Sequence, residues 1–582
     1  MKTAVTSPPT VPAGSALLLT LILTALALLT LGGILAWAST SSRLTYRANQ
    51  YACTVAAAEA ATEKVLSRLA QDYQTGGEKR VSDNLDLYRR IVLTGADAPY
   101  WSGWEFNDAC GNVGQTFVQP GTSTNYVVLS SAYAGLQGFV HTYTIVANAR
   151  QPSAVQNVVA GVLQQVQLAS IPVFQFAMYS SGNMEISCGQ PFTINGRVHS
   201  NGQLYVEPDN ILTFKTDVTA VGDILFERDP LDNRQPPSGS VVYQGREESH
   251  VSAMSLPIGT NNTPDAVRQI IEPPPTSEDP NSPMGLVRYY NQADMILVVT
   301  NNGANTAVSA TSGRFNNFAT VIPTNDLATF VCTTNSFWDA RENKTVQPID
   351  INVGNLASWS ATNSNLRIAL GTNDMSSVYV WDQRPAKTNY LGAVRLSNGK
   401  RLPARGLTVA TAEPLYVKGD FNQTNNANLG TTNTTTTLPA SLAADAVTIL
   451  SQNWSDPNSK GALSSRKATS TTVNAALVAG EVETTAGKYS GGMENFPRFL
   501  ETWGAANIFT YNGSMVKMFS SRYATSPWGT GNVYDPPARN WSYDINFENV
   551  MRLPPRTPCL QRVIRCQWAA LAPNQTAAVG SP

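Results

Sequence analysis

Residues 15–37 read SALLLTLILTALALLTLGGILAW, a run of 23 mostly aliphatic residues near the N-terminus, and no charged residue occurs between Thr3 and Ser42. As an α-helix rising about 1.5 Å per residue, this run spans about 34 Å, enough for a bilayer core of roughly 30 Å. A cleavable secretory signal is the alternative, since Ala36-Trp37-Ala38 has the A-x-A form. The apolar part of such signals is usually only about 7 to 15 residues long. We therefore predict a membrane-spanning helix that the mature protein retains.

The apolar run continues into an amphipathic segment. Arg43, Arg47, Glu63 and Arg68 lie off its apolar stripe, and Gly76-Gly77 supplies a stop. One helix over residues 15–73 is therefore expected, about 88 Å long if straight, with 15–37 in the membrane and 38–73 amphipathic. The stripe alternates spacings of four and three residues, as one helical face does, and consists of Leu44, Ala48, Tyr51, Val55, Ala58, Thr62, Val65 and Leu69.

A half-apolar, half-amphipathic N-terminal helix resembles the type IV pilins, and PilX-type minor pilins in particular. The match covers GSALLL at 14–19, the Leu/Thr-rich run, and RANQYACTVAAAEAATEKVL at 47–66 with its small-residue core Ala58-Glu59-Ala60. The resemblance implies that residues 1–14 form a leader cut by prepilin peptidase between Gly14 and Ser15. The fifth residue of the mature chain would be Leu19. Major pilins have a glutamate at this position that takes part in charge neutralisation between subunits, and this interaction is not available here.

Three sets of residues carry the expected assembly function. Other pilin-like subunits, the assembly machinery and the membrane are the implied partners. The processing residues are Gly14 and Ser15; the anchor and helix-packing residues are Leu17, Leu18, Leu19, Leu21, Leu28, Leu31 and Leu35; the amphipathic residues are Tyr51, Val55, Ala58, Glu59, Val65 and Leu69.

Residues 78–170 are predicted to form a small α+β head of the pilin kind. NLDLYRRIVL at 84–93 has the pattern of a short helix, while FVHTYTIVANAR at 139–150 alternates like a half-buried strand. AVQNVVAGVLQQVQL at 154–168 fits one long strand or a strand pair. A helix packed on a small antiparallel sheet is expected here by analogy of fold.

Residues 171–568 have a different texture, with short β-branched or aromatic runs separated by Gly, Asn and Asp. The unit "apolar, x, Gly, x, apolar" recurs in INGRV at 194–198 and YVKGDF at 416–421, which favours the stacked rungs of a parallel β-helix-like solenoid. A sandwich or barrel is the alternative. Residues 422–439 are expected to be mobile, residues 440–454 to be helical, and residues 569–582 to be a disordered tail. The fold class is thus α+β overall, mainly β.

The charge balance does not favour binding to nucleic acid or to a strongly acidic partner. The formal charge is −1, with 40 Lys+Arg against 41 Asp+Glu, so no basic field favours nucleic acid. The six cysteines show no C-x-x-C spacing, so we expect no metal and no cofactor. Cys559 and Cys566 are a possible disulfide if the bulk of the chain lies outside the cytoplasm.

No catalytic residue is predicted. The histidines are His141, His199 and His250, and no G-x-S-x-G, H-E-x-x-H, Walker A or G-x-G-x-x-G motif accompanies them. His199 is read as a structural residue that hydrogen-bonds a neighbouring rung. Aromatic residues near the C-terminus are expected to cap the solenoid rather than to bind sugar. The acidic candidates for polysaccharide chemistry have the spacing of turns and are Asp217, Asp223, Glu227 and Asp229.

The sequence therefore predicts a non-enzymatic subunit of a type IV pilus or pseudopilus-like system. It would be anchored once in the bacterial inner membrane, with the C-terminal bulk in the periplasm or displayed on a cell-surface filament, where adhesion and a surface polysaccharide partner are conceivable. The alternative is a membrane-tethered or secreted β-helix protein that binds or degrades polysaccharide.

Overall fold

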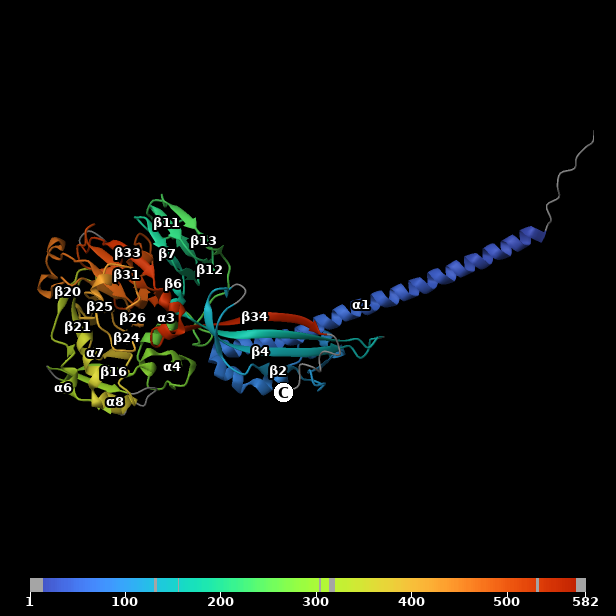
Figure 1. Ribbon diagram of the computed structural model, residues 1–582, viewed down its shortest axis with the longest axis horizontal. Coiled ribbons are helices and arrows are strands. Elements are labelled where there is room, and N and C mark those ends of the chain that lie inside the picture. Colours follow the sequence, from blue (N-terminus) through green and yellow to red (C-terminus); the bar gives the residue numbers. More distant parts are fainter. Residues whose placement is uncertain are drawn as a thin grey trace, which may run out of the picture.

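The computed structural model describes residues 14–129, 133–154, 156–302, 305–312, 320–529 and 533–571. Figure 1 shows a long projecting helix, a small sheet beside its second half, and a large β-rich body at the opposite end. The head comprises residues 50–172 and 559–571, and the passenger comprises residues 173–558. The chain is mostly β, with one long apolar helix. Of the predicted leader 1–14, only Gly14 lies within the described residues.

Helix α1 (Gly14–Asp83) is longer than the predicted helix 15–73. Its non-helical residue is Gly77, with φ 67°, so the predicted stop is a kink after which the chain makes one more turn. Residues 15–49 are exposed except for half-buried Ser41. In the described part of the chain, α1 is the one helix long and apolar enough to cross a membrane, with a mean hydropathy of 2.4 in its most apolar window.

The head sheet is antiparallel, in the order β1-β4-β5-β34, with β2 and β3 also paired to β4. The predicted strands 139–150 and 154–168 correspond to β4 and β5. The predicted helix 84–93 shortens to α2 (Leu85–Arg89), because Ile91, Val92 and Leu93 instead pack against clusters that include α1. The strands are β1 (Glu105–Asn107), β2 (Phe117–Pro120), β3 (Asn125–Val128), β4 (Gln137–Arg150), β5 (Val159–Pro172) and β34 (Cys559–Leu571).

The C-terminal strand belongs to the head. Strand β34 pairs with β5 along its length, and Cys559 lies opposite Pro172. Beside this pair, the Val173 amide donates to the Pro558 carbonyl at 3.0 Å. The passenger is thus inserted between two neighbouring head strands, and it ends ten residues before the predicted boundary at 568. Residues 569–571 are strand rather than tail, and residues 572–582 lie outside the described residues.

The predicted Cys559–Cys566 disulfide does not form. Both thiols are free, and the two residues lie on the single extended strand β34. A strand rises about 3.3 Å per residue, so seven residues separate the two Cα atoms by roughly 20 Å, whereas a disulfide needs about 5.5 Å.

The first arm of the passenger consists of three columns of short parallel strands. Sheet neighbours in each column are successive passes of the chain, and Val198 pairs with Val218 and Met178, a step of 20 residues in each direction. The columns are β6 (Phe176–Ser180), β9 (Arg197–Ser200), β12 (Val218–Ala220) and β15 (Glu247–Glu248); β7 (Met184–Ile186), β10 (Leu204–Val206) and β13 (Ile224–Leu225); and β8 (Phe192–Ile194), β11 (Ile211–Phe214) and β14 (Ser240–Tyr243).

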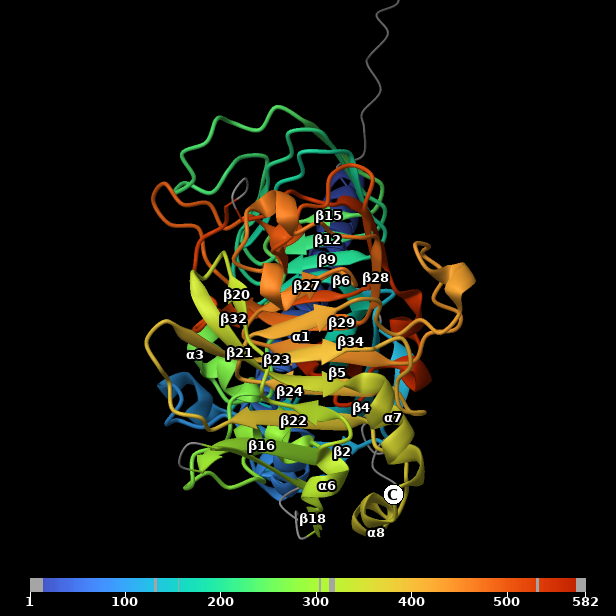
Figure 2. The same cartoon turned by 90° about the vertical axis from the view of Figure 1, so that its left-hand side faces the viewer.

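The chain then crosses to the far end of the passenger and builds a second arm back toward the first. Figure 2 shows the resulting stack of strands from β15 to β18. The 12-stranded sheet reads β15-β12-β9-β6-β32-β29-β26-β24-β22-β16-β17-β18, so the last pass, β32, pairs in parallel with the first, β6. Within the described residues none of the sheets closes into a barrel.

The second arm contains two further sheets and the short helices. The 7-stranded sheet runs β19-β21-β23-β25-β27-β30 with β20 on β21, and the third sheet is β28-β31-β33. The strands are β16 (Met295–Asn302), β17 (Asn305–Ser312), β18 (Thr320–Ile322), β19 (Val331–Cys332), β20 (Phe337–Asp339), β21 (Lys344–Asn352), β22 (Ser377–Asp382), β23 (Tyr390–Ser397), β24 (Leu407–Thr411), β25 (Leu415–Lys418), β26 (Ala440–Ala444), β27 (Val447–Leu450), β28 (Thr471–Asn474), β29 (Ala476–Glu481), β30 (Pro497–Phe499), β31 (Ile508–Gly513), β32 (Met515–Ser520) and β33 (Ala538–Tyr543). The helices are α3 (Pro264–Arg268), α4 (Pro283–Val287), α5 (Tyr289–Gln292), α6 (Thr324–Leu327), α7 (Val353–Thr362) and α8 (Ser364–Leu370).

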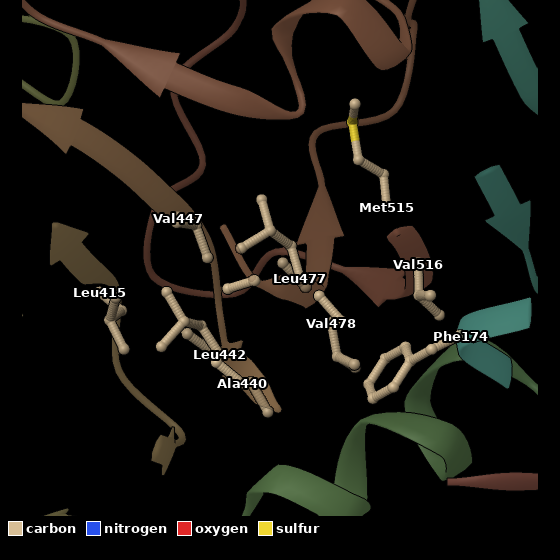
Figure 3. Packing of buried hydrophobic residues seen from close by; sticks show 14 of the residues in the cluster. Phe174, Leu415, Ala440, Leu442, Val447, Leu477, Val478, Met515 and Val516 are labelled. Carbon is tan, nitrogen blue, oxygen red and sulfur yellow. The ribbon is translucent and has the colours of Figure 1, made fainter. Parts of the chain in front are cut away.

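Aliphatic side chains from successive passes fill the passenger core. Leu442, Leu477 and Met515 lie in one register across β26, β29 and β32, and Leu415 faces Val447 across β25 and β27. Figure 3 shows these side chains stacked toward a common interior. Equivalent inward-facing positions on neighbouring passes carry apolar side chains that are buried against one another. This burial stabilises the stack, although the passes do not share one repeated sequence.

Two local predictions in the second arm were wrong. Residues 440–454 form β26 and β27 rather than a helix, because their runs of buried residues continue the stack. Residues 422–439, predicted to be mobile, are tied down by side-chain amides: Asn422 Nδ2 donates to the Leu438 carbonyl at 2.6 Å, and the Leu438 amide donates to Asn422 Oδ1 at 2.9 Å. Asparagine here serves as a hydrogen-bonding corner.

Candidate functional site: helix α1 and the head

The first half of α1 exposes its apolar side chains to the surroundings. The seven predicted anchor residues, Leu17, Leu18, Leu19, Leu21, Leu28, Leu31 and Leu35, are each between 52% and 68% exposed. The threonines of this segment satisfy their hydroxyls locally, for example Thr24 Oγ1 donates to the Thr20 carbonyl at 2.7 Å. A helix whose polar groups are all satisfied internally can enter a lipid or protein environment without loss of hydrogen bonds.

The alanine-rich middle of α1 lies close to the head sheet. Ala57, Ala58 and Ala61 are buried with Trp104 and Phe106, in a cluster that also contains Ala147, Ala149 and Val162 of β4 and β5. Small side chains allow the helix and the strands to approach closely, and the two aromatic rings fill the remaining volume. This contact explains the small-residue segment 56–61 without any reference to subunit packing.

The next two turns of α1 bury larger side chains. Val65, Leu69 and Tyr73 are at most 2% exposed and pack with Tyr143 and Val166 of the sheet. Tyr73 also shares a 3.1 Å hydrogen bond between its hydroxyl and Ser170 Oγ. Burial raises the pKa of the Tyr73 hydroxyl well above its usual range, so it stays neutral and pairs with Ser170.

The predicted apolar stripe is only partly the buried face. Of the stripe, Ala58, Thr62, Val65 and Leu69 are buried and Val55 is half-buried. Glu59, expected in the amphipathic segment beside the stripe, is also half-buried. Tyr51, predicted to face inward, is 40% exposed. The buried positions one and two turns before Ala58 are instead Thr54 and Gln50, and Gln50 Nε2 donates to the Gln156 carbonyl at 2.6 Å. A pattern that scores only apolar residues misses buried positions that are stabilised by hydrogen bonds.

A buried carboxylate secures the end of α1. The side chain of Asp72 is 2% exposed and lies between Arg68 (3.2 Å) and Arg80 (3.3 Å). It also accepts hydrogen bonds from Asn84 Nδ2 at 3.0 Å and from the Tyr88 hydroxyl at 2.9 Å. The segment after the Gly77 kink is therefore held against the helix by three groups on one carboxylate, those of Arg80, Asn84 and Tyr88.

Glu63 joins α1 to the C-terminal strand. Its carboxylate accepts from Gln164 Nε2 on β5 at 2.8 Å and from both Arg565 guanidinium nitrogens on β34, at 2.6 and 2.8 Å. A cleft of 830 Å³ lies beside this contact, between α1, β34 and the passenger residues Asn201 and Ser255. The passenger thus stands away from the second half of α1 on this side.

His199 is structural, as predicted, although it lies within β9 rather than at a corner. Its Nδ1 is 2.8 Å from Thr219 Oγ1 on the next pass, and its Nε2 is 3.0 Å from Asn201 Oδ1. Asn201 Oδ1 can only accept, so Nε2 carries the proton. Burial lowers the pKa of the imidazole to about 4, and both ring nitrogens are occupied, so His199 has no free base for catalysis.

The other candidate residues do not assemble into a catalytic group. His141 contacts Glu78 in the head, and His250 is a solvated side chain 3.3 Å from Asp223. Asp217 pairs with Arg197 at 2.7 Å and with Arg246 at 3.1 Å. Burial acts to raise its pKa, but the hydrogen bond from the Arg246 amide and the two guanidinium groups outweigh it and lower the pKa. In the described ranges no group of three or more His, Cys, Asp or Glu side chains could hold a metal ion.

The C-terminal aromatic residues form packing clusters. Trp503 is buried against Phe499 and Phe509, and Trp541 lies edge-on to Phe509. Trp528 Nε1 donates to the Tyr534 hydroxyl at 3.0 Å. These contacts favour the structural reading of this aromatic group over a sugar-stacking surface.

No protein family model matches the chain, and no curated protein matches it. Among solved structures, it is similar to the competence-associated pilin ComZ from Thermus thermophilus, with 90% of this chain and 97% of that chain covered. The identity is 11% and the TM-score is 0.29, so the overall superposition is loose and no residue role transfers from it.

Proposed function

We propose that this protein is a structural subunit of a type IV pilus or pseudopilus-like system. The observation that carries the proposal is the division of α1: the apolar side chains of its first half are exposed, while the second half of the same helix packs on an antiparallel sheet. A helix that only anchored the chain would need no rigid continuation into the head. The continuous helix instead presents an apolar surface at a fixed angle to the head.

The exposed first half of α1 occupies two environments in this proposal. Residues 15–37 span the bacterial inner membrane before assembly, because about 34 Å of apolar helix matches its hydrocarbon core. After assembly, the same leucines pack against the helices of neighbouring subunits. The passenger of more than 380 residues then lies outside the membrane, where its bulk suits a filament tip or a minor position.

The passenger serves as a displayed body in this proposal, built as a parallel β-helix-like solenoid with an adhesive role. Support comes from the 20-residue step between the first passes of the first arm and from side-chain hydrogen bonds that join neighbouring passes. Thr408 and Ser441 join β24 to β26 at 2.8 Å, and Asn512 Nδ2 donates to Asn474 Oδ1 at 2.8 Å between β31 and β28.

The mature N-terminus tests the proposal. We expect mass spectrometry of the protein, expressed in a host with a prepilin peptidase, to give a chain that begins at Ser15. Gly14→Leu should leave the leader in place, and the matched change Ala38→Leu should not alter processing. A chain beginning at Ser39 or Thr40 would indicate signal peptidase and refute the pilin proposal, as would an intact Met1.

A further inference from the structure

One corner of the passenger carries a column of acidic side chains on neighbouring passes. Asp382 ends β22, Glu413 lies between β24 and β25, Asp445 lies between β26 and β27, and Glu481 ends β29. Since β22, β24, β26 and β29 are successive neighbours in the 12-stranded sheet, these four residues lie at the same edge of the stack. Like charges stacked in this way destabilise one another unless each has a counter-ion.

Three of the four carboxylates have a counter-ion. Asp382 pairs with Arg384 at 2.6 Å, Asp445 pairs with Arg268 at 2.6 Å, and Glu481 pairs with Lys517 at 2.9 Å. Within the described part of the chain, the Glu413 carboxyl group forms no ion pair and accepts no hydrogen bond. Glu413 is therefore the position in the column that is open to a ligand.

Glu413 lies in a cleft of 430 Å³ between the two large sheets of the second arm. The floor of the cleft is Gly392 on β23, where a Cβ atom would lie 2.9 Å from Asp382 Oδ2 and 3.5 Å from Glu413 Oε2. The backbone of Gly392 does not have the positive φ that requires glycine. Glycine here leaves space, and two carboxyl groups face that space.

The rim of the cleft is cationic and aromatic. Lys344 and Lys387 line it, and neither forms an ion pair within the described ranges. Tyr390 and Tyr523 also line it and are 43% and 38% exposed. Exposed tyrosine rings present flat apolar faces with a polar tip, and free lysines attract anions.

We propose that this cleft binds an acidic oligosaccharide, a chain of uronic acid residues. Lys344 and Lys387 pair with the sugar carboxylates, Tyr390 and Tyr523 contact the apolar faces of the rings, and Glu413 with Asp382 hydrogen-bonds ring hydroxyls over Gly392. The cleft volume is within the roughly 300–1,000 Å³ of small-ligand sites. Two unpaired lysines favour an acidic glycan over a neutral one, and they disfavour a metal cation. The inference rests on the proposed function only for the location of the cleft outside the membrane. The binding test measures the cleft itself and does not depend on that location.

Glu413 gives the site a pH dependence. Burial, reinforced by the charges of Asp382 and Asp445, raises the pKa of the Glu413 carboxyl group to about 8. At neutral pH it is a hydrogen-bond donor without charge, and above that pKa it repels an acidic ligand. The titratable and charged groups that face it are Asp382, Arg384, Lys344, Lys387, Tyr390, Asp445, Arg268, Arg522, Tyr523 and the buried Tyr379.

Calorimetric titration of the detergent-solubilised full-length protein tests the site. The probes are hexagalacturonate and the neutral hexamer cellohexaose, at pH 7. We expect the acidic hexamer to bind at least about tenfold more tightly than the neutral one. Lys387→Ala and Tyr390→Ala should each weaken binding about tenfold, whereas the matched exposed residues outside the cleft, Lys488→Ala and Tyr100→Ala, should leave it unchanged.

Two further variants separate a specific site from general charge attraction. Between pH 7 and pH 9 the affinity of the unaltered protein should fall about tenfold, following deprotonation of a group with a pKa near 8. Glu413→Gln keeps the donor and removes the titration, so its affinity should stay flat over that range. Gly392→Ala should weaken binding, because the added Cβ atom would occupy the space at the floor of the cleft.

The inference is overturned if hexagalacturonate at millimolar concentration gives no heat of binding, if cellohexaose binds equally well, or if the cleft variants match their controls. Failure of the pilin proposal would be seen separately, in an N-terminus other than Ser15 with binding intact.

Discussion

The contact between α1 and the head sheet allows a quantitative test of which helix face is buried. We predict that Leu69→Ala destabilises the head, whereas Tyr51→Ala on the same helix does not. Both residues belong to the apolar stripe expected from the sequence, but Leu69 is 0% exposed and Tyr51 is 40% exposed. Truncating a fully buried leucine costs about 3 to 5 kcal/mol, and exposed positions usually change stability by less than about 0.5 kcal/mol.

The magnitude follows from the surroundings of Leu69. It packs in a cluster with Val65, Tyr73, Tyr143 and Val166, whose rings and branched side chains cannot easily collapse into the vacated space. For a unit the size of the head, each kcal/mol shifts the melting temperature by about 2 to 4 °C. Leu69→Ala should therefore lower the melting transition of the head by about 10 °C.

Differential scanning calorimetry of the full-length protein in non-ionic detergent provides the measurement. The Leu69 cluster consists of head residues, whereas the larger cluster that fills the passenger also includes the head residues Val140, Ile171 and Leu560 at the junction. The passenger transition should therefore shift less than the head transition in Leu69→Ala, and not at all in Tyr51→Ala. Equal shifts for Leu69→Ala and Tyr51→Ala would refute the assigned helix face. A passenger shift as large as the head shift in Leu69→Ala would contradict the assignment of Leu69 to the head cluster.

Further predictions concern the passenger and its boundaries. The pKa of His199 in the folded protein, about 4, lies below its unfolded value near 6.5, so the free energy of unfolding falls as the pH drops below about 6.5. At pH 5 the loss is roughly 2 kcal/mol. His199→Gln should remove this pH dependence in calorimetry. Burial and the Glu481 charge raise the pKa of Glu185 to about 8, so its carboxyl group lowers stability progressively as pH rises from about 4.5 to 8; Glu185→Gln should raise the passenger melting temperature at pH 8 and not at pH 4, and equal gains would contradict the assignment. Alkylation of the denatured protein under non-reducing conditions should label both Cys559 and Cys566, and a mass two hydrogens lower with no label would show the bridge instead. The fragment 173–558 should be soluble and resist proteolysis, whereas 171–568 should aggregate through its unpaired β34 residues; the opposite ranking would count against the insertion boundary.

The helix and the β-rich character of the rest could be predicted from sequence because each depends on local periodicity. The apolar run 15–37 and the buried Val65 and Leu69 follow a helical period, and the strand pattern at 139–150 follows a period of two. The burial of Gln50 and Thr54 could not be predicted from apolar periodicity. Thr54 donates to the Gln50 carbonyl within the helix, and the partner of Gln50, the carbonyl of Gln156, is brought close only by the tertiary fold.

The irregular repeat of the passenger also has a physical explanation. In the first arm the first passes take 20 residues, as between His199 and Thr219, and the pass that leads to β15 takes 29, as between Val218 and Glu247. In the second arm Thr408 and Ser441 on neighbouring passes are 33 residues apart, and Asn474 and Asn512 are 38 apart. Insertions at the corners lengthen these passes while the strands keep their register. A search for a fixed period therefore finds none, although the inward-facing residues repeat.

The Glu413 cleft had no sequence signal of its own. Its residues come from β21 to β23, the turn after β24 and the loop after β32, more than 170 positions apart along the chain, and none belongs to a short motif. Of the acidic residues singled out from the sequence, Asp217 is instead paired with two arginines, and Asp223 lies 3.3 Å from His250. What distinguishes Glu413 is the absence of a counter-ion, and that is a property of the folded arrangement.

The insertion of the passenger between β5 and β34 sets an order of events for biogenesis. Glu63 and Arg565 are 502 positions apart, so their contact needs the whole passenger to be present between them. Closing so large a loop is slow for a free chain, but the folded passenger, in which β32 pairs on β6, brings Pro172 and Cys559 together. The head sheet is completed by β34. A chain whose passenger misfolds cannot complete the head sheet that supports α1, so the position of β34 makes the support of α1 depend on a finished passenger.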